Sequence, residues 1–286
     1  MRREPEVVIP FDRLPPGFAE RVASSPADAA PPKPAATTVL VRDADTGPEL
    51  LLLERHRSAA FVPGAYVFPG GRVDSADDDP ALHQRLGVLP RGPAPAYWSA
   101  ALRELFEETG VLLARRADGS PCAAAATDAR VAEWRHALLA ESATLLDVLG
   151  ALDVQPDLSR MVYCAHWVTP LAEPKRYDTR FFLCELPPGC EARIDEREMT
   201  DMQWLTPDAA LAAFAAGALQ MVFPTVKTIE RLAHYGSVDA MLDAFRSADI
   251  PAVLPRLVRT ESGIGIVVEN YEQTEQDEHD EGTHTG

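Results

Sequence analysis

Short apolar runs bounded by turn residues alternate along this 286-residue chain with longer segments whose apolar residues recur every three or four positions. The short runs have the length and the β-branched or aromatic content of strands. They predict strands at 37–42, 49–55, 161–168, 179–185 and 198–205. The segment from Asp43 to Pro48 is expected to be the turn between the first two strands, and it lacks the closing glutamate of a calcium loop. We therefore expect a sheet whose first two strands form a hairpin.

The segments with helical spacing predict five helices, at 96–109, 128–149, 207–217, 225–234 and 238–247. The second would bury Val131, Trp134, Leu138, Leu145 and Leu149. The third begins with Thr206 as its N-cap and a proline at the first helical position, and it ends at a glycine. Residues 253–268 are expected to return as a strand or as an extended packing segment.

The composition changes sharply at both ends of the chain. Residues 1–35 are rich in proline and small residues, which predicts an extended arm or linker. A main domain is expected over 36–250, with a helical C-terminal part, followed by a packing extension over 251–270. Residues 271–286 are polar and acidic, and this predicts a disordered tail.

Apolar residues make up 46% of the chain and charged residues 25%, as in ordinary soluble globular proteins. The formal net charge of −17 argues against a basic surface that binds nucleic acid. The first residues lead into no apolar signal core and no apolar run is long enough to span a bilayer, so we expect neither a signal segment nor a membrane span. The four cysteines form no C-x-x-C pair, and this favours free thiols in a reducing cytoplasm. We expect a cytoplasmic protein that binds neither nucleic acid nor membranes, with its oligomeric state open, a homodimer included.

Three glutamates share one face of the first predicted helix. Glu104, Glu107 and Glu108 stand at positions i, i+3 and i+4, where like charges cost about 0.2–0.5 kcal/mol per pair on an exposed helix. A sequence that tolerates this arrangement is expected to neutralise it with cations, and Arg103, four residues before Glu107, can supply one. Hard carboxylate oxygens suit Mg²⁺ or Mn²⁺, which bind through a few carboxylates together with substrate phosphates. The alternative is a solvated acidic face on a surface helix.

The surroundings of the three glutamates favour the metal site. Gly110 follows the helix where a left-handed C-cap is wanted, and Val67 to Gly71 upstream is an extended segment that breaks into a Gly-Gly loop. The stretch RELFEETGV, from Arg103 to Val111, resembles the second half of the Nudix hydrolase box at every fixed position. That box runs Gly, five residues, Glu, seven residues, then Arg-Glu-apolar-any-Glu-Glu-any-Gly-apolar.

The first half of the box departs from the family pattern. With Gly71 as the box glycine, Asp77 stands where the family has glutamate, and residues 78–102 separate it from Arg103 where the family has seven residues. The box is therefore interrupted by an insertion at about 78–95, expected as a loop with one helical turn. The flanking sequence FVPGAYVFPGG, 61–71, resembles the interrupted-box subgroup that includes the peroxisomal coenzyme A diphosphatases. Asp77 to Asp79 could form a further metal site, but a solvated loop is the preferred interpretation.

The resemblance implies a Nudix α/β/α sandwich around a mixed β-sheet with helical additions, and a reaction. The expected enzyme is a diphosphatase that hydrolyses a nucleoside diphosphate linked to another moiety with Mg²⁺ or Mn²⁺. Coenzyme A or acyl-coenzyme A, giving 3′,5′-ADP and a phosphopantetheine, is the first choice of substrate. The alternatives are ADP-ribose, NADH or another dinucleotide, and a non-catalytic Nudix-like module that regulates by binding a nucleotide.

The resemblance also implies roles for individual residues. Glu104, Glu107 and Glu108 are carried over as metal ligands, joined by the carbonyl of Gly71, and Arg103 as the ion pair that orients them.

Three arginines are candidates for substrate phosphates. Arg57 lies just ahead of the Gly-Gly loop, with ordinary surface charge as its alternative. Arg176 and Arg180 belong to a loop that resembles one before a core strand in the interrupted-box subgroup, with a salt bridge to Asp178 as the alternative.

A general base is expected outside the box, because metal-bound water still profits from a carboxylate that takes its proton. In the family a glutamate stands some six residues before a tryptophan that ends a core strand. Glu198 fits that spacing ahead of Trp204, and Glu196 is the neighbour that could replace it. The alternative is a solvated acidic turn that pairs with Arg193 or Arg197.

Overall fold

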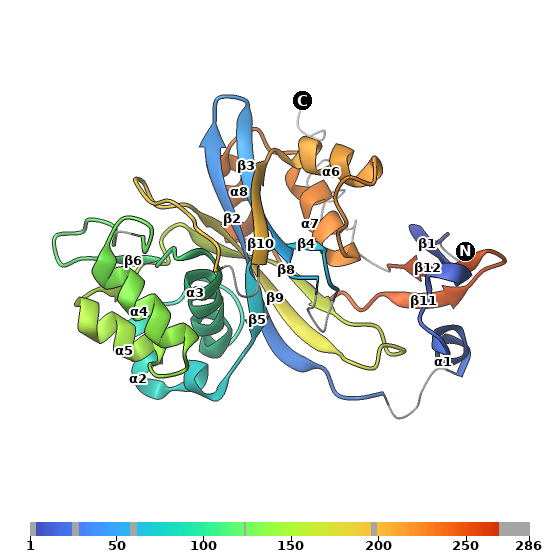
Figure 1. Ribbon diagram of the computed structural model, residues 1–286, viewed down its shortest axis with the longest axis horizontal. Helices are drawn as coiled ribbons and strands as arrows, with labels where there is room; N and C mark the ends of the chain where they lie inside the picture. The colour runs from blue at the N-terminus through green and yellow to red at the C-terminus, as the bar shows by residue number, and fades with distance from the viewer. Residues whose placement is uncertain (1–3, 25–28, 58–61, 123, 196–198, 269–286) are drawn as a thin grey trace, which may run out of the picture. The chain divides into compact units, whose positions relative to one another are not determined.

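A seven-stranded sheet forms the centre of the main part of the chain (Figure 1). The computed structural model describes residues 4–24, 29–57, 62–122, 124–195 and 199–268. These residues divide into two compact units: one has the described residues within 35–165 and 180–248, and the other has those within 4–34, 166–179 and 249–268.

The predicted strands are all present in the sheet. Its order is β10 (Met199–Leu205), β3 (Gly47–Arg55), β2 (Lys33–Ala44), β9 (Tyr177–Glu185) and β8 (Met161–Val168). The short strands β4 (Tyr66–Val67) and β5 (Gly70–Arg72) pair with β3 and β2. The first two long strands form the expected antiparallel hairpin, with Ala44 opposite Gly47.

Strand β3 is buried on both faces, as a continuous apolar run indicates. Leu50, Leu51, Leu52 and Leu53 are all fully buried. Leu51 and Leu53 pack in the same cluster as the helix α3 (Pro95–Thr109), and side chains alternate along a strand, so Leu50 and Leu52 point to the opposite layer. The sheet therefore lies between two helical layers, and the predicted α/β class is confirmed.

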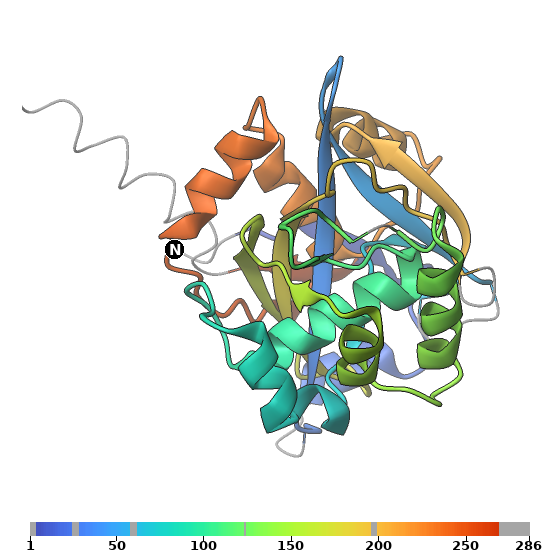
Figure 2. The same ribbon diagram turned by 90° about the vertical axis from the view of Figure 1, so that its left-hand side faces the viewer.

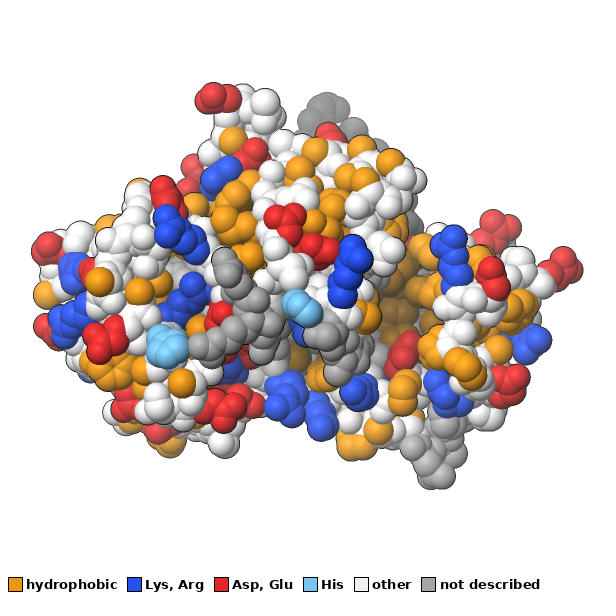
Figure 3. All heavy atoms as spheres, viewed as in Figure 1, with side chains coloured by type: hydrophobic (Ala, Val, Ile, Leu, Met, Phe, Trp, Pro, Cys, Tyr) orange, Lys and Arg blue, Asp and Glu red, His pale blue; other side chains and the backbone are white. Residues whose placement is uncertain are grey.

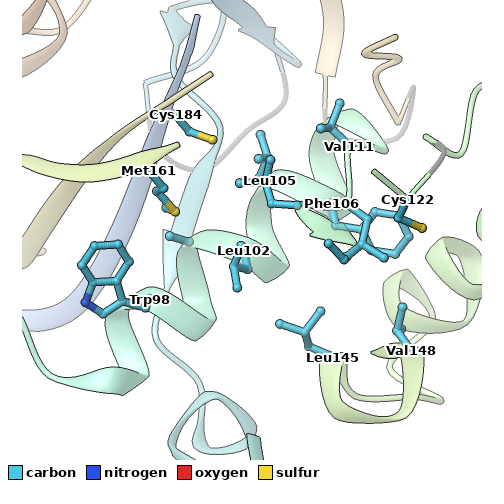
Figure 4. Packing of buried hydrophobic residues seen from close by; sticks show 14 of the residues in the cluster. Trp98, Leu102, Leu105, Phe106, Val111, Cys122, Leu145, Val148, Met161 and Cys184 are labelled. Carbon is cyan, nitrogen blue, oxygen red and sulfur yellow. The ribbon is translucent and has the colours of Figure 1, made fainter. Parts of the chain in front are cut away.

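Helix α3, which carries the three glutamates, is the central element of one layer. Three further helices lie on the side of α3 away from the sheet (Figures 1 and 2): α2 (Pro80–Leu86) and α4 (Ala129–Leu139) contact α3, and α5 (Leu145–Leu152) contacts α2 and α4. Figure 4 shows how Trp98, Leu102, Leu105 and Phe106 of α3 enter the core. Close by, β6 (Ala114–Arg115) pairs with β7 (Gln155–Pro156).

The other layer contains α6 (Pro207–Ala215), α7 (Phe223–Leu232) and α8 (Val238–Arg246), close to the ranges that the sequence predicts. The Thr206 side chain accepts a hydrogen bond from the Ala209 amide at 3.3 Å, which confirms the predicted N-cap of α6.

The prediction of one long helix over 128–149 is wrong, because the chain breaks between α4 and α5. Glu141 has a φ of +54°, a left-handed conformation that ends a helix. Thr144 then opens a new helix, with its side chain accepting from the Asp147 amide at 3.2 Å while the Asp147 carboxylate accepts from the Thr144 amide at 2.8 Å. The apolar spacing continues across the break, so periodicity alone misses it.

The box insertion contains more helix than the single turn that the sequence predicts. The short 3-10 helix η2 (Ser75–Asp78) leads directly into α2, whose N-cap is Asp79. Leu82 and Leu86 of α2 are buried in the same cluster as α3. The insertion therefore contributes a helix to the core.

The other unit contains a three-stranded antiparallel sheet with the order β1 (Val7–Pro10), β12 (Gly263–Val267) and β11 (Arg256–Arg259). The 3-10 helix η1 (Phe11–Arg13) and the helix α1 (Phe18–Ser24) follow β1. An extended arm is thus a wrong prediction for residues 7–24, whereas the C-terminal segment does return as strands. The predicted tail lies outside the described residues, and the predicted domain boundaries stay predictions.

The four cysteines are free and buried, as the sequence indicates. Within the described ranges, no helix is long and apolar enough to cross a membrane. On the face that Figure 3 shows, basic and acidic side chains are interspersed.

Candidate active site

Arg103 is the centre of the charged cluster on α3, and its guanidinium uses five hydrogen bonds, the full donor capacity of an arginine side chain. Nε and Nη2 donate to the two carboxylate oxygens of Asp77 at 2.9 and 2.8 Å. Nη2 also donates to the carbonyl of Arg72 at 2.8 Å. Nη1 donates to Glu104 Oε1 at 2.9 Å and to Glu107 Oε2 at 3.0 Å. The ion pair predicted between Arg103 and Glu107 is confirmed.

Asp77 is a full member of this cluster, and the interpretation as a solvated loop is wrong for this one residue of the three aspartates. Its residue exposure is 1%, and its carboxylate forms a two-point contact with Arg103. The turn η2 holds it in place, because the Asp74 amide donates to Asp77 Oδ2 at 2.8 Å. Asp78, in contrast, is solvated, with a side-chain exposure of 75%.

The Gly-Gly loop meets the cluster through its backbone. The Gly70 amide donates to Glu108 Oε2 at 2.9 Å, and a Cβ at Gly70 would lie 2.5 Å from the carbonyl oxygen of Ala36. A Cβ at Gly71 would lie 2.3 Å from Glu104 Oε1. A Cβ at Gly70 would therefore clash with backbone, and a Cβ at Gly71 would displace the Glu104 carboxylate. The Gly71 carbonyl as a metal ligand stays a prediction.

Burial shapes the electrostatics of the cluster. It raises the pKa of Glu107 to about 7, although the Arg103 guanidinium opposes the shift. Burial also raises the pKa of Glu104, again against the effect of Arg103. For Arg103 itself, burial lowers the pKa, but the hydrogen bond to Asp77 and the charges of Glu104 and Asp77 outweigh it and raise the pKa above its ordinary value. One guanidinium therefore serves three carboxylates, and the cluster has excess negative charge when all are ionised.

This donor set fits a hard divalent cation. Carboxylate oxygens on one helix face, with more negative charge than Arg103 can neutralise, are the chemistry that Mg²⁺ and Mn²⁺ select. Among the described residues, no group of three or more His, Cys, Asp or Glu side chains is already gathered as a metal site. Glu104 and Glu107 each meet Arg103 through one oxygen atom, and Glu108 meets the Gly70 amide through Oε2.

The last carbonyl groups of α3 have no hydrogen-bond donors within the helix, and groups from elsewhere in the chain donate to them. The Arg193 amide donates to the Thr109 carbonyl at 2.7 Å, and the Asp195 amide donates to the Glu108 carbonyl at 3.3 Å. The segment before β10 is thus tied to the end of α3. Glu196 and Glu198, the candidates for the general base, lie outside the described residues, so this role stays a prediction.

The three candidate substrate arginines have different surroundings. Arg57 is exposed, and its Cγ would lie 3.9 Å from a Cβ at Gly64. Arg180 places its guanidinium 5.1 Å from the ring centroid of Tyr97 on α3.

Arg176 belongs to the other unit and is buried. Its side chain donates to the carbonyls of Thr169 at 3.0 Å and Ala30 at 2.8 Å, which holds its loop, while Asp178 pairs with His166. The roles of all three arginines toward a substrate stay predictions.

Sequence reasoning missed one residue at the site, Arg135 of α4, which donates two hydrogen bonds to the Glu107 carbonyl. It stands 28 residues away from Glu107 on a different helix, so no spacing rule connects the two.

Comparison with known proteins decides the family. The model of the NUDT19 Nudix domain matches residues 88–232, a range that starts inside the box insertion and contains Arg103 and the three glutamates. The chain belongs to this Nudix family. The solved structure of a Nudix hydrolase from Alicyclobacillus acidocaldarius is 29% identical to this Nudix protein, with a TM-score of 0.62 over 75% of this chain and 96% of the other. The Nudix fold is therefore confirmed.

Curated relatives of this Nudix protein include the acyl-coenzyme A diphosphatase NUDT19 of Homo sapiens, 29% identical over 233 residues. The protein of the same name from Gallus gallus is 28% identical over 238 residues. In both cases the match covers 67% of this chain and 62% of the relative. The chain thus spans less than two thirds of the length of the curated relatives that it matches.

Proposed function

We propose that this Nudix protein is a metal-dependent diphosphatase whose substrate is coenzyme A or acyl-coenzyme A. The observation that carries the proposal is the arrangement of three glutamates on one helix, in which Arg103 pairs with Glu104 and Glu107 while Glu108 accepts from the amide of the Gly-Gly loop. The names of the human and chicken relatives support the choice of substrate. Water would add across the diphosphate, breaking one bond from phosphorus to the bridging oxygen. The products would be 3′,5′-ADP and phosphopantetheine or its acyl form.

The residues of the charged cluster have different roles in this proposal. Glu104, Glu107 and Glu108 would hold the metal, because their carboxylates share one helix face, and those of Glu104 and Glu108 lie against the Gly-Gly loop. Arg103 fixes the orientation of two of these carboxylates while Asp77 and the Arg72 carbonyl hold its guanidinium. When bound, Mg²⁺ or Mn²⁺ supplies charge neutralisation of the diphosphate and activation of a water molecule.

We propose Glu198 as the base that takes the proton of the attacking water. The support is its spacing of six residues from Trp204 and the anchoring of Asp195, three residues before it, to the end of α3. Glu198→Gln should lower kcat, leave KM and metal affinity nearly unchanged, and flatten the acidic limb of the pH profile. Loss of metal affinity would instead make Glu198 a ligand, and an unchanged kcat would return the role to Glu196 or Glu104.

A substrate panel tests the proposal. Purified protein with Mg²⁺ or Mn²⁺ is assayed with coenzyme A, acyl-coenzyme A, ADP-ribose, NADH and diadenosine polyphosphates, with products separated by chromatography and efficiencies compared as kcat/KM. We expect 3′,5′-ADP from the coenzyme A compounds at the highest efficiency. If ADP-ribose were hydrolysed about a hundredfold more efficiently than coenzyme A, the substrate assignment would be wrong. Binding of nucleotides without hydrolysis of any would favour a regulatory module.

A further inference from the structure

The carbonyl groups at the C-terminal end of α3 accept hydrogen bonds from different parts of the chain. Gly110, with a φ of +70°, closes the helix through its own amide, which donates to the Phe106 carbonyl at 2.9 Å. Backbone amides of the segment before β10 take the carbonyls of Glu108 and Thr109. The Glu107 carbonyl is different, because a charged side chain from another helix takes it.

That side chain is Arg135 of α4. Its Nε and Nη2 donate to the Glu107 carbonyl oxygen at 3.0 and 2.8 Å, so two donors converge on one acceptor. A charged donor makes a stronger hydrogen bond than a neutral one. The positive charge also lies at the C-terminal end of α3, where the helix dipole favours a cation.

The backbone of Gly110 makes room for this contact. A Cβ at Gly110 would lie 3.0 Å from Arg135 Nη1, closer than ordinary van der Waals contact. The Arg135 guanidinium is partly buried, and the charges of Asp195 and Glu108 reach it. The contact therefore occupies a fitted position at the end of the helix.

Glu107 is consequently held from two sides. Arg103 Nη1 contacts its side chain, and Arg135 contacts its backbone. The last turn of α3, which carries Glu107 and Glu108, cannot shift without breaking the two hydrogen bonds from α4.

We propose that Arg135 is a positioning residue that fixes the last turn of α3, so that the Glu107 and Glu108 carboxylates are arranged for a divalent cation. This inference rests on the proposed metal-dependent function. It predicts that Arg135 controls metal affinity although it does not touch the metal itself. Partners that orient metal ligands typically change metal affinity by about 10–100-fold when removed.

Arg130 provides a matched control on the same helix. It is exposed, and its Nη2 donates to the carbonyl of Ala151, at the end of α5, away from the glutamates. Arg130→Ala therefore removes an arginine–carbonyl contact of α4 that does not involve α3. Arg135→Ala removes the contact with Glu107, and Arg135→Lys keeps the charge but loses the two-point geometry.

The experiment measures Mn²⁺ binding to the metal-free full chain by isothermal titration calorimetry, with urea unfolding of each variant alongside. We expect Arg135→Ala to raise the Kd for Mn²⁺ about tenfold or more, Arg135→Lys to raise it less, and Arg130→Ala to leave it unchanged. If Arg135→Ala proves unfolded, Arg135→Lys and Arg135→Gln provide the comparison.

A lowered unfolding midpoint with an unchanged Kd for Mn²⁺ in the Arg135 variants would overturn the inference, because the contact would then stabilise the fold alone. An equal loss of affinity in Arg130→Ala would also overturn it. If the wild-type chain bound no Mn²⁺ at all, the proposed function itself would fail. If the wild type bound Mn²⁺ and the Arg135 variants bound it equally well, only the inference about Arg135 would fail.

Discussion

Arg103 and Asp77 form the most buried ion pair of the site, with a side-chain exposure of 9% for the arginine and 1% for the aspartate. Glu104 and Glu107 would still balance the charge of Arg103 without Asp77, but two buried N–H donors of the guanidinium would lose their acceptors. Asp77→Ala should therefore lower the free energy of unfolding by about 1–3 kcal/mol. Urea denaturation measures this change. Asp78→Ala, one residue along and largely exposed, is the control and should change stability by less than about 0.5 kcal/mol. Equal effects of the two substitutions would refute the role of the pair.

A second prediction at this scale concerns pH. Because the pKa of Glu107 is raised to about 7 in the folded protein, protonation of Glu107 favours the folded state. Its contribution to the stability of the metal-free protein is full below the unfolded pKa of about 4.3 and is lost as pH rises through about 7. A cation needs the ionised carboxylate, so the affinity for Mn²⁺ should rise between about pH 6 and pH 8, with protons released on binding.

Titration calorimetry at the two pH values, in buffers of different ionisation enthalpy, measures both the affinity and the proton release. Glu107→Gln should reduce the pH dependence without abolishing it, because burial raises the pKa of Glu104 as well. An affinity for Mn²⁺ that is equal at both pH values would contradict the prediction.

The sequence predicts those contacts of Arg103 that lie within one helix and not the one that spans the insertion. The pair with Glu107 follows from a spacing of four residues, because helix geometry brings such positions together. The pair with Asp77 joins residues 26 apart, and the turn η2 and α2 between them determine it. Aspartate at position 77, where the family has glutamate, does not by itself predict the 3-10 helix that brings its carboxylate to Arg103.

Among the elements, α2 shows that the box insertion is part of the core. Leu82 is 1% exposed and packs in the hydrophobic cluster that contains the apolar side chains of α3, whereas Val88 in the same insertion is 98% exposed. Leu82→Ala should lower the free energy of unfolding by about 2–5 kcal/mol, the usual range for a buried leucine. Val88→Ala is the matched control, expected to change stability by less than about 0.5 kcal/mol. Chemical denaturation of both variants provides the measurement, and a negligible effect of Leu82→Ala would mean that the insertion is dispensable to the fold.

Most elements follow from the sequence because their apolar patterns reflect burial directly. Strand β8 has the predicted bounds of 161–168, since its apolar run ends at turn residues. The break between α4 and α5 escapes prediction because it depends on a left-handed residue, Glu141, and a capping box at Thr144, while the apolar spacing continues. Strand β1 escapes because its four residues gain their partner, β12, from the far end of the sequence.

At the scale of the whole molecule, the net charge of −17 makes local compensation essential for any anionic substrate. In the charged cluster on α3, the Arg103 guanidinium already donates hydrogen bonds to three carboxylates and one carbonyl. The charge of a diphosphate would therefore have to be neutralised chiefly by bound cations, which links substrate binding to metal binding.

The most direct test of the metal-dependent diphosphatase is the turnover of Glu107→Gln. Formation of 3′,5′-ADP from coenzyme A is followed with Mn²⁺ or Mg²⁺, with and without a chelator, for the wild type and two variants. Glu107→Gln removes one charge from the cluster at almost unchanged volume, and Glu133→Gln on the exposed side of α4 is the control. The account predicts that the chelator abolishes turnover and that Glu107→Gln lowers kcat by orders of magnitude, while Glu133→Gln matches the wild type. Near wild-type kcat for Glu107→Gln would contradict it.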